Sequence, residues 1–440
     1  MFSAIQRVFT TPDLRNKLMF TLAIVAIYRL GSFIPAPFVN YANVQQCLKA
    51  GTASTNGIYE LVNLFSGGAL LQLSIFALGI MPYITASIIT QLLRVVIPRF
   101  ETLYKEGQAG QAKITQYTRY LTIGLGLLQS TTLIAVARQG GGALFGTNCS
   151  GSLFSDSSWW AISLMIITMT AGTGLIMWLA ELVTERGIGN GMSLLIFTSI
   201  AARFPASLVS IARSKSVEVL LGVIGVGVVI VLLVILVEQS QRRIPVQYAK
   251  RMVGKRTYGG QATYLPIKVN MAGVVPVIFA SSLLYLPGLI AQFNGPDANG
   301  KIADWVIWIN NNLTKGDHPL YMLMYFLLIV AFTYFYVSIT FNPEEVSDNM
   351  KQYGGFIPGI RAGRPTTEYL EYVLSRITLP GSLYLGIVAL IPLFALTLLN
   401  ANQDFPFGGT SILIIVGVGL ETVKQISAQM QQRNYEGLLK

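Results

Sequence analysis

The chain has 440 residues, of which 52% are hydrophobic and only 12% are charged. A soluble domain of this size could not bury that much apolar surface, so the composition indicates an integral membrane protein. Continuous apolar runs of about 20 residues exclude a β-barrel, whose strands alternate. The net charge of +11 is typical of a basic cytoplasmic face in a membrane protein, so nucleic acid is not the first inference.

The chain opens with an amphipathic basic tail, MFSAIQRVFTTPDLRNK, rather than with a cleavable signal peptide. Hydropathy then predicts ten membrane spans, the fifth interrupted by Arg203 and Pro205. The tenth is apolar only to Leu420, and we expect its helix to continue into water. The spans are expected at Leu18–Pro35, Ser74–Val96, Arg119–Ala137, Trp159–Ala180, Met192–Ala212, Val217–Val237, Ala272–Gln292, Leu320–Phe341, Leu379–Leu399 and Thr410–Ala428.

The distribution of basic residues orients these spans. With the N-terminus inside, the cytoplasmic segments carry most of the 31 Lys and Arg residues, which predicts that both termini are cytoplasmic. Five spans in each half predict two inverted halves, 1–214 and 215–440. A local match supports this repeat, because Pro82/Ala86/Ser87 in the second span correspond to Pro276/Ala280/Ser281 in the seventh, with Ile84 and Ile278 two residues after each proline.

Both matching segments look interrupted. Ala77–Gln91 is an apolar helix with a proline near its centre, and Asn63–Leu71 before it is too short and too rich in glycine to cross a bilayer. The segment Ile58–Leu71 is compatible with a loop, an interfacial helix or a re-entrant helix that fills a cavity. Two interrupted helices, one in each half, suggest a pathway between the halves and hence transport.

Two cytoplasmic loops, 238–268 and 342–378, are unusually long. Their Gly-Gly and Pro-Gly points, flanked by apolar and basic residues, predict ordered hairpins or short helices that protrude. Basic protrusions suit docking to a large anionic or acidic partner.

No catalytic, metal or cofactor site is predicted. The single histidine, His318, is expected to be a solvated loop residue, and Glu185–Gly191 (ERGIGNG) lacks the preceding strand of a dinucleotide site, so we expect a glycine-rich turn. Cys47 and Cys149 lie in predicted outer loops without a motif. A disulfide between them is possible, although two free thiols are the simpler interpretation.

The span interiors also lack the acids and histidines of an ion relay. Arg29 and Arg203 are the intramembrane charges, and neither has an acidic partner within its own span. This disfavours a secondary carrier and implies an external source of energy. The pairs Ile80/Ile84 and Met192/Ile196 each share a helix face, which is compatible with ordinary packing or with a hydrophobic constriction that excludes ions.

The chain closely resembles the SecY family, whose members form the central subunit of the bacterial protein-conducting channel. The resemblance extends through essentially all ten spans. It is carried by Phe65–Leu70 (FSGGAL), Ser74–Ala86 (SIFALGIMPYITA), Glu185–Gly191 (ERGIGNG), Lys268–Pro276 (KVNMAGVVP), Ile278–Ser282 (IFASS), Asn342–Pro343, Pro358–Arg361 (PGIR) and Gly408–Ser411 (GGTS).

The resemblance implies an all-α membrane protein with two inverted five-helix halves around an hourglass pore and a short re-entrant plug helix at about 59–71. The implied pore ring is Ile80, Ile84, Met192, Ile196, Ile278 and Ile414, in which Met192 departs from the isoleucine common in the family. The implied plug includes Tyr59, Leu64, Phe65, Gly67 and Gly68, and the implied lateral gate is lined by Thr85, Gln91, Ser281 and Ser282.

The implied function is translocation of unfolded secretory polypeptides across the bacterial plasma membrane and lateral release of membrane segments into it. The implied docking residues for a motor or the ribosome are Arg251, Lys255, Arg256 and Arg361. The implied partners are SecE-like and SecG-like small subunits, the SecA ATPase, which supplies ATP hydrolysis, the ribosome, signal peptides, preproteins and membrane lipids, with no cofactor. The alternatives are a secondary solute transporter and a docking receptor.

Overall fold

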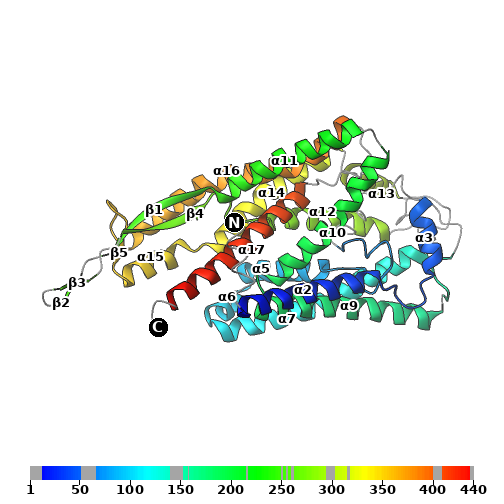
Figure 1. Cartoon of the computed structure of the whole chain (residues 1–440), viewed down its shortest axis with the longest axis horizontal. Coiled ribbons are helices and arrows are strands. Elements are labelled where there is room, and N and C mark those ends of the chain that lie inside the picture. The colour runs from blue at the N-terminus through cyan, green and yellow to red at the C-terminus, as the bar shows by residue number, and fades with distance from the viewer. Residues whose placement is uncertain are drawn as a thin grey trace.

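A computed structural model of the chain describes residues 12–50, 66–138, 152–156, 158–214, 217–248, 251–253, 256–258, 262–293, 303–314, 318–399 and 409–436. Long helices run roughly along one axis and form a bundle (Figure 1). The helices are α2 (Pro12–Phe33), α3 (Tyr41–Ala50), α5 (Met81–Val96), α6 (Pro98–Lys105), α7 (Gln108–Arg138), α9 (Trp159–Arg186), α10 (Gly191–Ser214), α11 (Val217–Gln239), α12 (Val275–Phe293), α13 (Asp304–Ile309), the π-helix η1 (Asn310–Thr314), α14 (Pro319–Thr340), α15 (Pro343–Gln352), α16 (Arg364–Leu399) and α17 (Gly409–Glu436).

Every expected span overlaps a helix. Within the described residues, five helices are long and apolar enough to cross a membrane, or six if a bent pair is counted as one span. Those five correspond to the third, fourth, eighth, ninth and tenth expected spans, and the bent pair corresponds to the second. The others are α2 and the shorter apolar stretches in α10, α11 and α12. α17 continues to Glu436, as expected from the polar end of the tenth span.

The start of the second span was predicted wrongly. Residues 74–80 form turns, and the helix begins at Met81. Pro82 therefore lies in the first helical turn instead of near the centre, a position that tolerates a missing N–H because that donor has no partner within the helix. Pro276 occupies the same place in α12, and the glycine three residues earlier has positive φ in both cases, at Gly79 (58°) and Gly273 (60°). The two matching segments thus begin their helices alike.

α5 and α6 form the bent pair. Their axes differ by 97°, and the break is at Ile97, whose extended backbone precedes Pro98. The residue before a proline is pushed out of the helical region, which accounts for the position of the break. The Arg94 guanidinium lies 3.2 Å from the centre of the Tyr104 ring and so joins the two helices across the bend.

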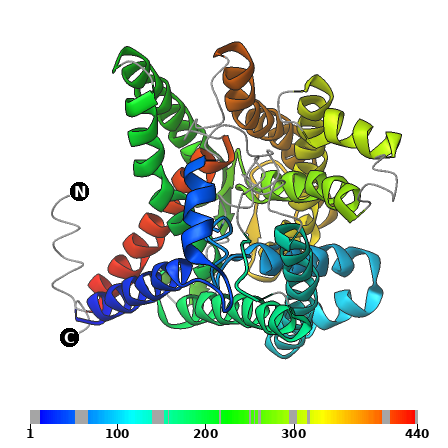
Figure 2. The ribbon, with the colours of Figure 1, turned by 90° about the vertical axis from the view of Figure 1, so that its right-hand side faces the viewer.

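Three clusters of buried apolar side chains organise the bundle. One is built from residues between Ala36 and Met169, and a second from buried residues between Ile230 and Val416. The third, which we call the junction cluster, draws its buried residues from α2, the 66–80 turn segment, α5, α9, α10, α12 and α17. It therefore joins elements that are far apart in the sequence, as the view along the bundle in Figure 2 illustrates.

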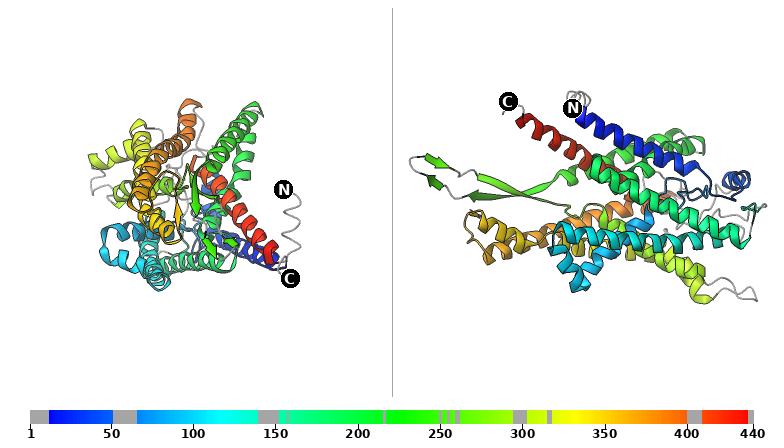
Figure 3. Two further views of the ribbon diagram at one scale, coloured as in Figure 1. Left: turned by 90° about the vertical axis from the view of Figure 1, so that its left-hand side faces the viewer. Right: turned by 90° about the horizontal axis from the view of Figure 1, so that it is seen from below.

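The two long loops are ordered protrusions at one end of the bundle (Figure 3). Strands β1 (Gln241–Tyr248) and β4 (Ala262–Lys268) pair antiparallel, with a shorter pair, β2 (Arg251–Val253) and β3 (Arg256–Tyr258), beyond them. β5 (Gly355–Phe356) from the second loop pairs with β1. The prediction of ordered hairpins and short helices is confirmed. The fold is not entirely α-helical, however, because the protrusions contain this small sheet. A fourth cluster, which includes Ile244, Val337 and Leu370, packs it against α14 and α16.

The opposite end carries α3 and α13 (Figure 1). Cys47, on α3, is disulfide-bonded. The chain has one other cysteine, Cys149, which lies outside the described residues, so the simpler interpretation of two free thiols was wrong. His318 was expected to be a solvated loop residue, but it is half-buried and caps α14, with Nδ1 accepting from the Leu320 N–H at 3.2 Å.

Candidate functional site

The structure brings the six candidate ring residues together in the junction cluster. Five are at most 8% exposed and belong to its buried core, and Met192 is half-buried and packs against them. They come from four separate elements and one turn: Ile80 ends the turn segment, Ile84 lies on α5, Met192 and Ile196 on α10, Ile278 on α12, and Ile414 on α17. These side chains are apolar and branched or flexible, so the cluster offers no specific polar contact to a passing solute.

The ERGIGNG segment positions the two ring residues of α10. It is a tight turn between α9 and α10, as expected, and its polar groups are satisfied locally. The Gly191 N–H donates to Thr184 Oγ1 at 2.9 Å, and the Met192 N–H donates to Asn190 Oδ1 at 3.1 Å. A Cβ at Gly191 would lie 1.9 Å from the Ala180 carbonyl oxygen. The glycine there therefore permits the close approach that aims Met192 and Ile196 at the cluster.

Part of the candidate plug lies outside the described residues, namely Tyr59, Leu64 and Phe65. Its described end, residues 66–73, forms turns, so the predicted re-entrant helix does not extend this far. Gly67 and Gly68 have positive φ values of 67° and 95°, which explains the requirement for glycine. Backbone hydrogen bonds fasten the following residues to the chain after α2, from Ile75 N–H to the Ile34 carbonyl and from Ala36 N–H to the Leu73 carbonyl, both 2.9 Å.

The candidate gate residues lie on two helices that contact one another, α5 and α12. Thr85 and Ser281 satisfy their hydroxyl groups within their own helices, at 2.9 Å to the carbonyls of Met81 and Ile278. Ser282 Oγ is buried without a hydrogen-bond partner in the part of the chain that the structure describes, and Gln91 is exposed. Within the described residues, these hydroxyl groups therefore form no hydrogen bond between α5 and α12 that separating the two helices would break.

The candidate docking residues lie on the protrusions. Arg251 pairs with Tyr258 and Arg256 with Val253 in the β2–β3 ribbon, whereas Lys255 lies outside the described residues. Arg361 is exposed on a loop that two hydroxyl groups hold in shape: Ser347 Oγ donates to the Gly363 carbonyl at 2.9 Å, and Thr366 Oγ1 donates to the Arg361 carbonyl at 2.8 Å. The arginine is thus presented on a fixed backbone.

Sequence reasoning noted Arg29 but missed what it binds. Arg29 Nη1 donates to the Gly67 carbonyl at 3.2 Å. Its neighbour Tyr28 is fully buried and forms a 2.6 Å hydroxyl–hydroxyl hydrogen bond with Ser199 of α10. A search for an acidic partner could not find these contacts, because one partner is a backbone carbonyl and the other is a serine 171 positions away.

The same arrangement of helices is found in solved structures. A solved structure described as a protein-conducting channel superimposes with a TM-score of 0.63 at 18% identity, covering 94% of this chain and 92% of the other. Sec61 in a canine ribosome–channel complex superimposes with a TM-score of 0.60 at 18% identity, covering 94% and 92%.

The sequence comparisons then define the family. The SecY family model matches residues 74–423. The protein translocase subunit SecY of Streptomyces galbus is 64% identical over 446 residues, covering 100% of both chains. The chain belongs to the SecY family, a family of multi-pass membrane channel subunits of the protein translocase and not of enzymes.

Proposed function

We propose that the chain forms the path along which unfolded secretory polypeptides cross the bacterial plasma membrane, and that the six ring residues are its constriction. The observation that carries this proposal is the meeting of Ile80, Ile84, Met192, Ile196, Ile278 and Ile414 in the junction cluster between the two local cores. On this proposal the pore separates halves 1–214 and 215–440.

An apolar ring suits this substrate class. A translocating polypeptide presents every type of side chain in turn, so a specific binding site would stop it. Branched apolar side chains deform around the chain and form few strong contacts, and an empty apolar constriction excludes ions by dewetting. Met192, which is unbranched and flexible, makes this ring more deformable than one made only of isoleucine.

We further propose that membrane segments and signal peptides leave sideways into lipid between α5 and α7 on one side and α12 and α14 on the other. The contact of α5 with α12 supports this choice. So does the buried Oγ of Ser282, which has no hydrogen-bond partner within the described residues, because an unpaired hydroxyl gains a partner when a polypeptide or water enters.

The motor and the ribosome are proposed to dock on the protrusions, through Arg361 and the basic β2–β3 tip with Arg251, Lys255 and Arg256. The related Sec61 structure is of a ribosome–channel complex, and a basic surface attracts ribosomal RNA or an acidic ATPase. The start of α2 and the end of α17 both lie toward the hairpin (Figure 3), so one cytoplasmic face carries both termini in this proposal.

A SecE-like companion is proposed to cover the apolar groove between α10 and α11, with a SecG-like subunit as a further component. The groove is lined by Phe204, Leu208, Ile224, Val228, Val231 and Leu232. A single apolar helix placed there would brace the connection between the halves, which is the short loop between α10 and α11.

A crosslinking experiment tests the path. Cys47 and Cys149 are replaced, one cysteine is placed at Ile278, and a secretory precursor with its own cysteine is stalled midway in vesicles that contain SecE and SecA. We expect a disulfide between position 278 and the stalled precursor, and none from a cysteine at Ile167, which is 63% exposed on α9. Protected precursor without a crosslink from any of the six ring positions would refute the proposed path.

A further inference from the structure

Arg29 is a charged residue in the first membrane helix that bonds to the plug rather than to another charge. Its guanidinium donates to the carbonyl of Gly67 at 3.2 Å and lies over the Phe33 ring at 5.2 Å. A hydrogen bond from a charged donor to a carbonyl is roughly twice as strong as a neutral one. The contact therefore holds the described end of the plug, residues 66–73, against α2.

Gly67 fits between Arg29 and α10 with no space to spare. A Cβ added at this glycine would lie 2.9 Å from Arg29 Nη1 and 3.2 Å from Ser199 Cα. Its φ of 67° is one that side chains other than glycine rarely adopt. Only glycine fits at position 67 for two reasons: the positive φ and the close approach of Arg29 and Ser199.

The frame around this contact is rigid. The buried Tyr28–Ser199 hydrogen bond joins α2 to α10, the two helices between which Gly67 lies. Tyr28 also stacks on Phe76 with ring centres 6.0 Å apart, and a Cβ at Gly31 would lie 2.1 Å from the Phe76 ring, so α2 packs closely on the turn segment. Arg29 is therefore held in place by its neighbours on the same helix.

We propose that Arg29 is a positioning residue of the channel: it retains the plug in the closed pore by binding the Gly67 carbonyl. This rests on the proposed function. When the plug leaves, the guanidinium loses its carbonyl partner at membrane depth, where charged groups are costly. The hydrogen bond from Arg29 to Gly67 thus favours the closed state. A translocating polypeptide must break this hydrogen bond when it displaces the plug.

The test is ion conductance through the full chain, with its companion membrane subunits, in planar bilayers without precursor. A hydrogen bond to a charged group contributes enough to change an equilibrium by about tenfold or more. Arg29→Met is therefore expected to raise the resting conductance about tenfold, and Arg29→Lys, which keeps one charged donor, is expected to raise it less. Gly67→Ala keeps the arginine, but its Cβ would lie 2.9 Å from Arg29 Nη1 on a backbone strained for alanine, so it disturbs the same contact and is expected to leak as well.

Leu30→Ala is the matched control, since Leu30 follows Arg29 on α2 and is 67% exposed. Its resting conductance is expected to equal that of the unmodified channel. Correct folding of each variant is checked by its assembly with the companion membrane subunits, measured by co-purification. Unchanged conductance in both Arg29→Met and Gly67→Ala would overturn the proposal. An Ile84→Ser/Ile278→Ser double variant separates the two proposals: if it leaks while the Arg29 and Gly67 variants do not, the ring stands and the role of Arg29 fails.

Discussion

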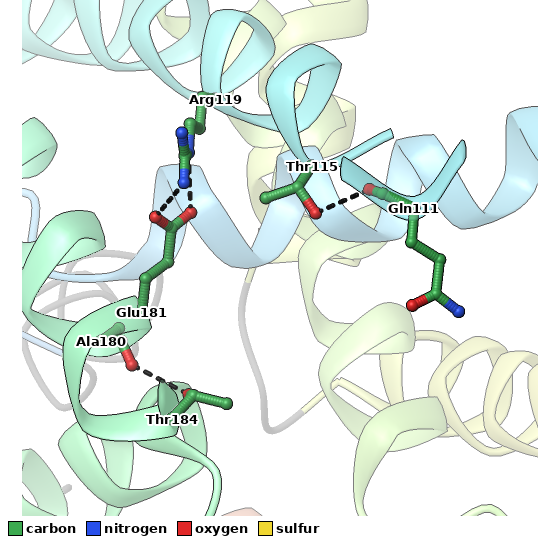
Figure 4. Close-up of polar contacts among 6 residues, drawn as sticks. All are labelled: Gln111, Thr115, Arg119, Ala180, Glu181 and Thr184. Atoms are coloured by element: carbon green, nitrogen blue, oxygen red, sulfur yellow. Dashed lines mark hydrogen bonds and ion pairs between the residues drawn. The ribbon is translucent and has the colours of Figure 1, made fainter. Parts of the chain in front are cut away.

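At the scale of single residues, the polar contacts inside this bundle join helices that sequence patterns treat as separate. Arg119 of α7 and Glu181 of α9 form a bidentate salt bridge, with Nε–Oε1 at 3.0 Å and Nη2–Oε2 at 2.6 Å (Figure 4). Glu181 is the more buried partner, with its side chain 15% exposed against 47% for Arg119. Such parallel bonds fix orientation as well as distance.

Glu181→Gln should lower the free energy of unfolding by about 1 kcal/mol, because the amide offers one acceptor where the carboxylate offers two and no longer carries charge. Thermal unfolding of the purified protein measures this change. Glu368→Gln is the matched control, since its pair with Arg364 is long, at 3.4 Å, with side chains 66% and 91% exposed, and should contribute almost nothing. Equal shifts in the two variants would contradict the greater contribution assigned to the Arg119–Glu181 pair.

At the scale of elements, α5 and α12 begin in the same way, and each carries a candidate ring residue within its first turn. Each begins after a glycine with positive φ and carries a proline in its first turn. The proline marks where the helix can start, and the glycine makes the turn that precedes it. The similarity of these two starts extends the shared Pro-x-x-x-Ala-Ser pattern to Gly-x-x-Pro-x-x-x-Ala-Ser and strengthens the inference of a repeat.

Gly79→Ala should destabilise the protein by about 1 kcal/mol or more, because the left-handed backbone at φ 58° is strained for alanine. The expected result is a lower thermal unfolding temperature and a higher resting conductance, since Ile80 follows directly. Gly124→Ala is the control: this glycine lies inside α7 with open space around it, so alanine there should be neutral or stabilising. A stable, non-leaking Gly79→Ala variant would contradict the role given to this turn.

At the scale of the whole molecule, the bundle has two local cores and the junction cluster, whose buried residues come from helices of both halves. The basic protrusions extend from one end of it, packed by a cluster of their own that includes Ile244 and Leu370. The proposed docking surface therefore lies apart from the proposed constriction, as expected of a channel whose energy comes from a partner outside the membrane.

Arg361→Glu should abolish motor-driven export while the variant itself still inserts into the membrane, because the change reverses charge on an exposed loop without touching the bundle. ATP-dependent transport of a precursor into vesicles measures it. Lys351→Glu makes the same reversal at an exposed position of α15 and should retain export. Normal export by Arg361→Glu would show that the motor docks elsewhere.

The amino-acid sequence by itself determined the class, the ten apolar segments and the protruding loops, because hydropathy, glycine and proline act locally. The ring, plug, gate and docking assignments came from resemblance to a family. Only the tertiary structure decided that the six candidate ring side chains meet, that Cys47 is disulfide-bonded, and that Arg29 binds the Gly67 carbonyl. Contacts of this kind depend on how helices that are distant in the sequence pack together. Every residue has a backbone carbonyl, so the sequence cannot show which carbonyl accepts a hydrogen bond.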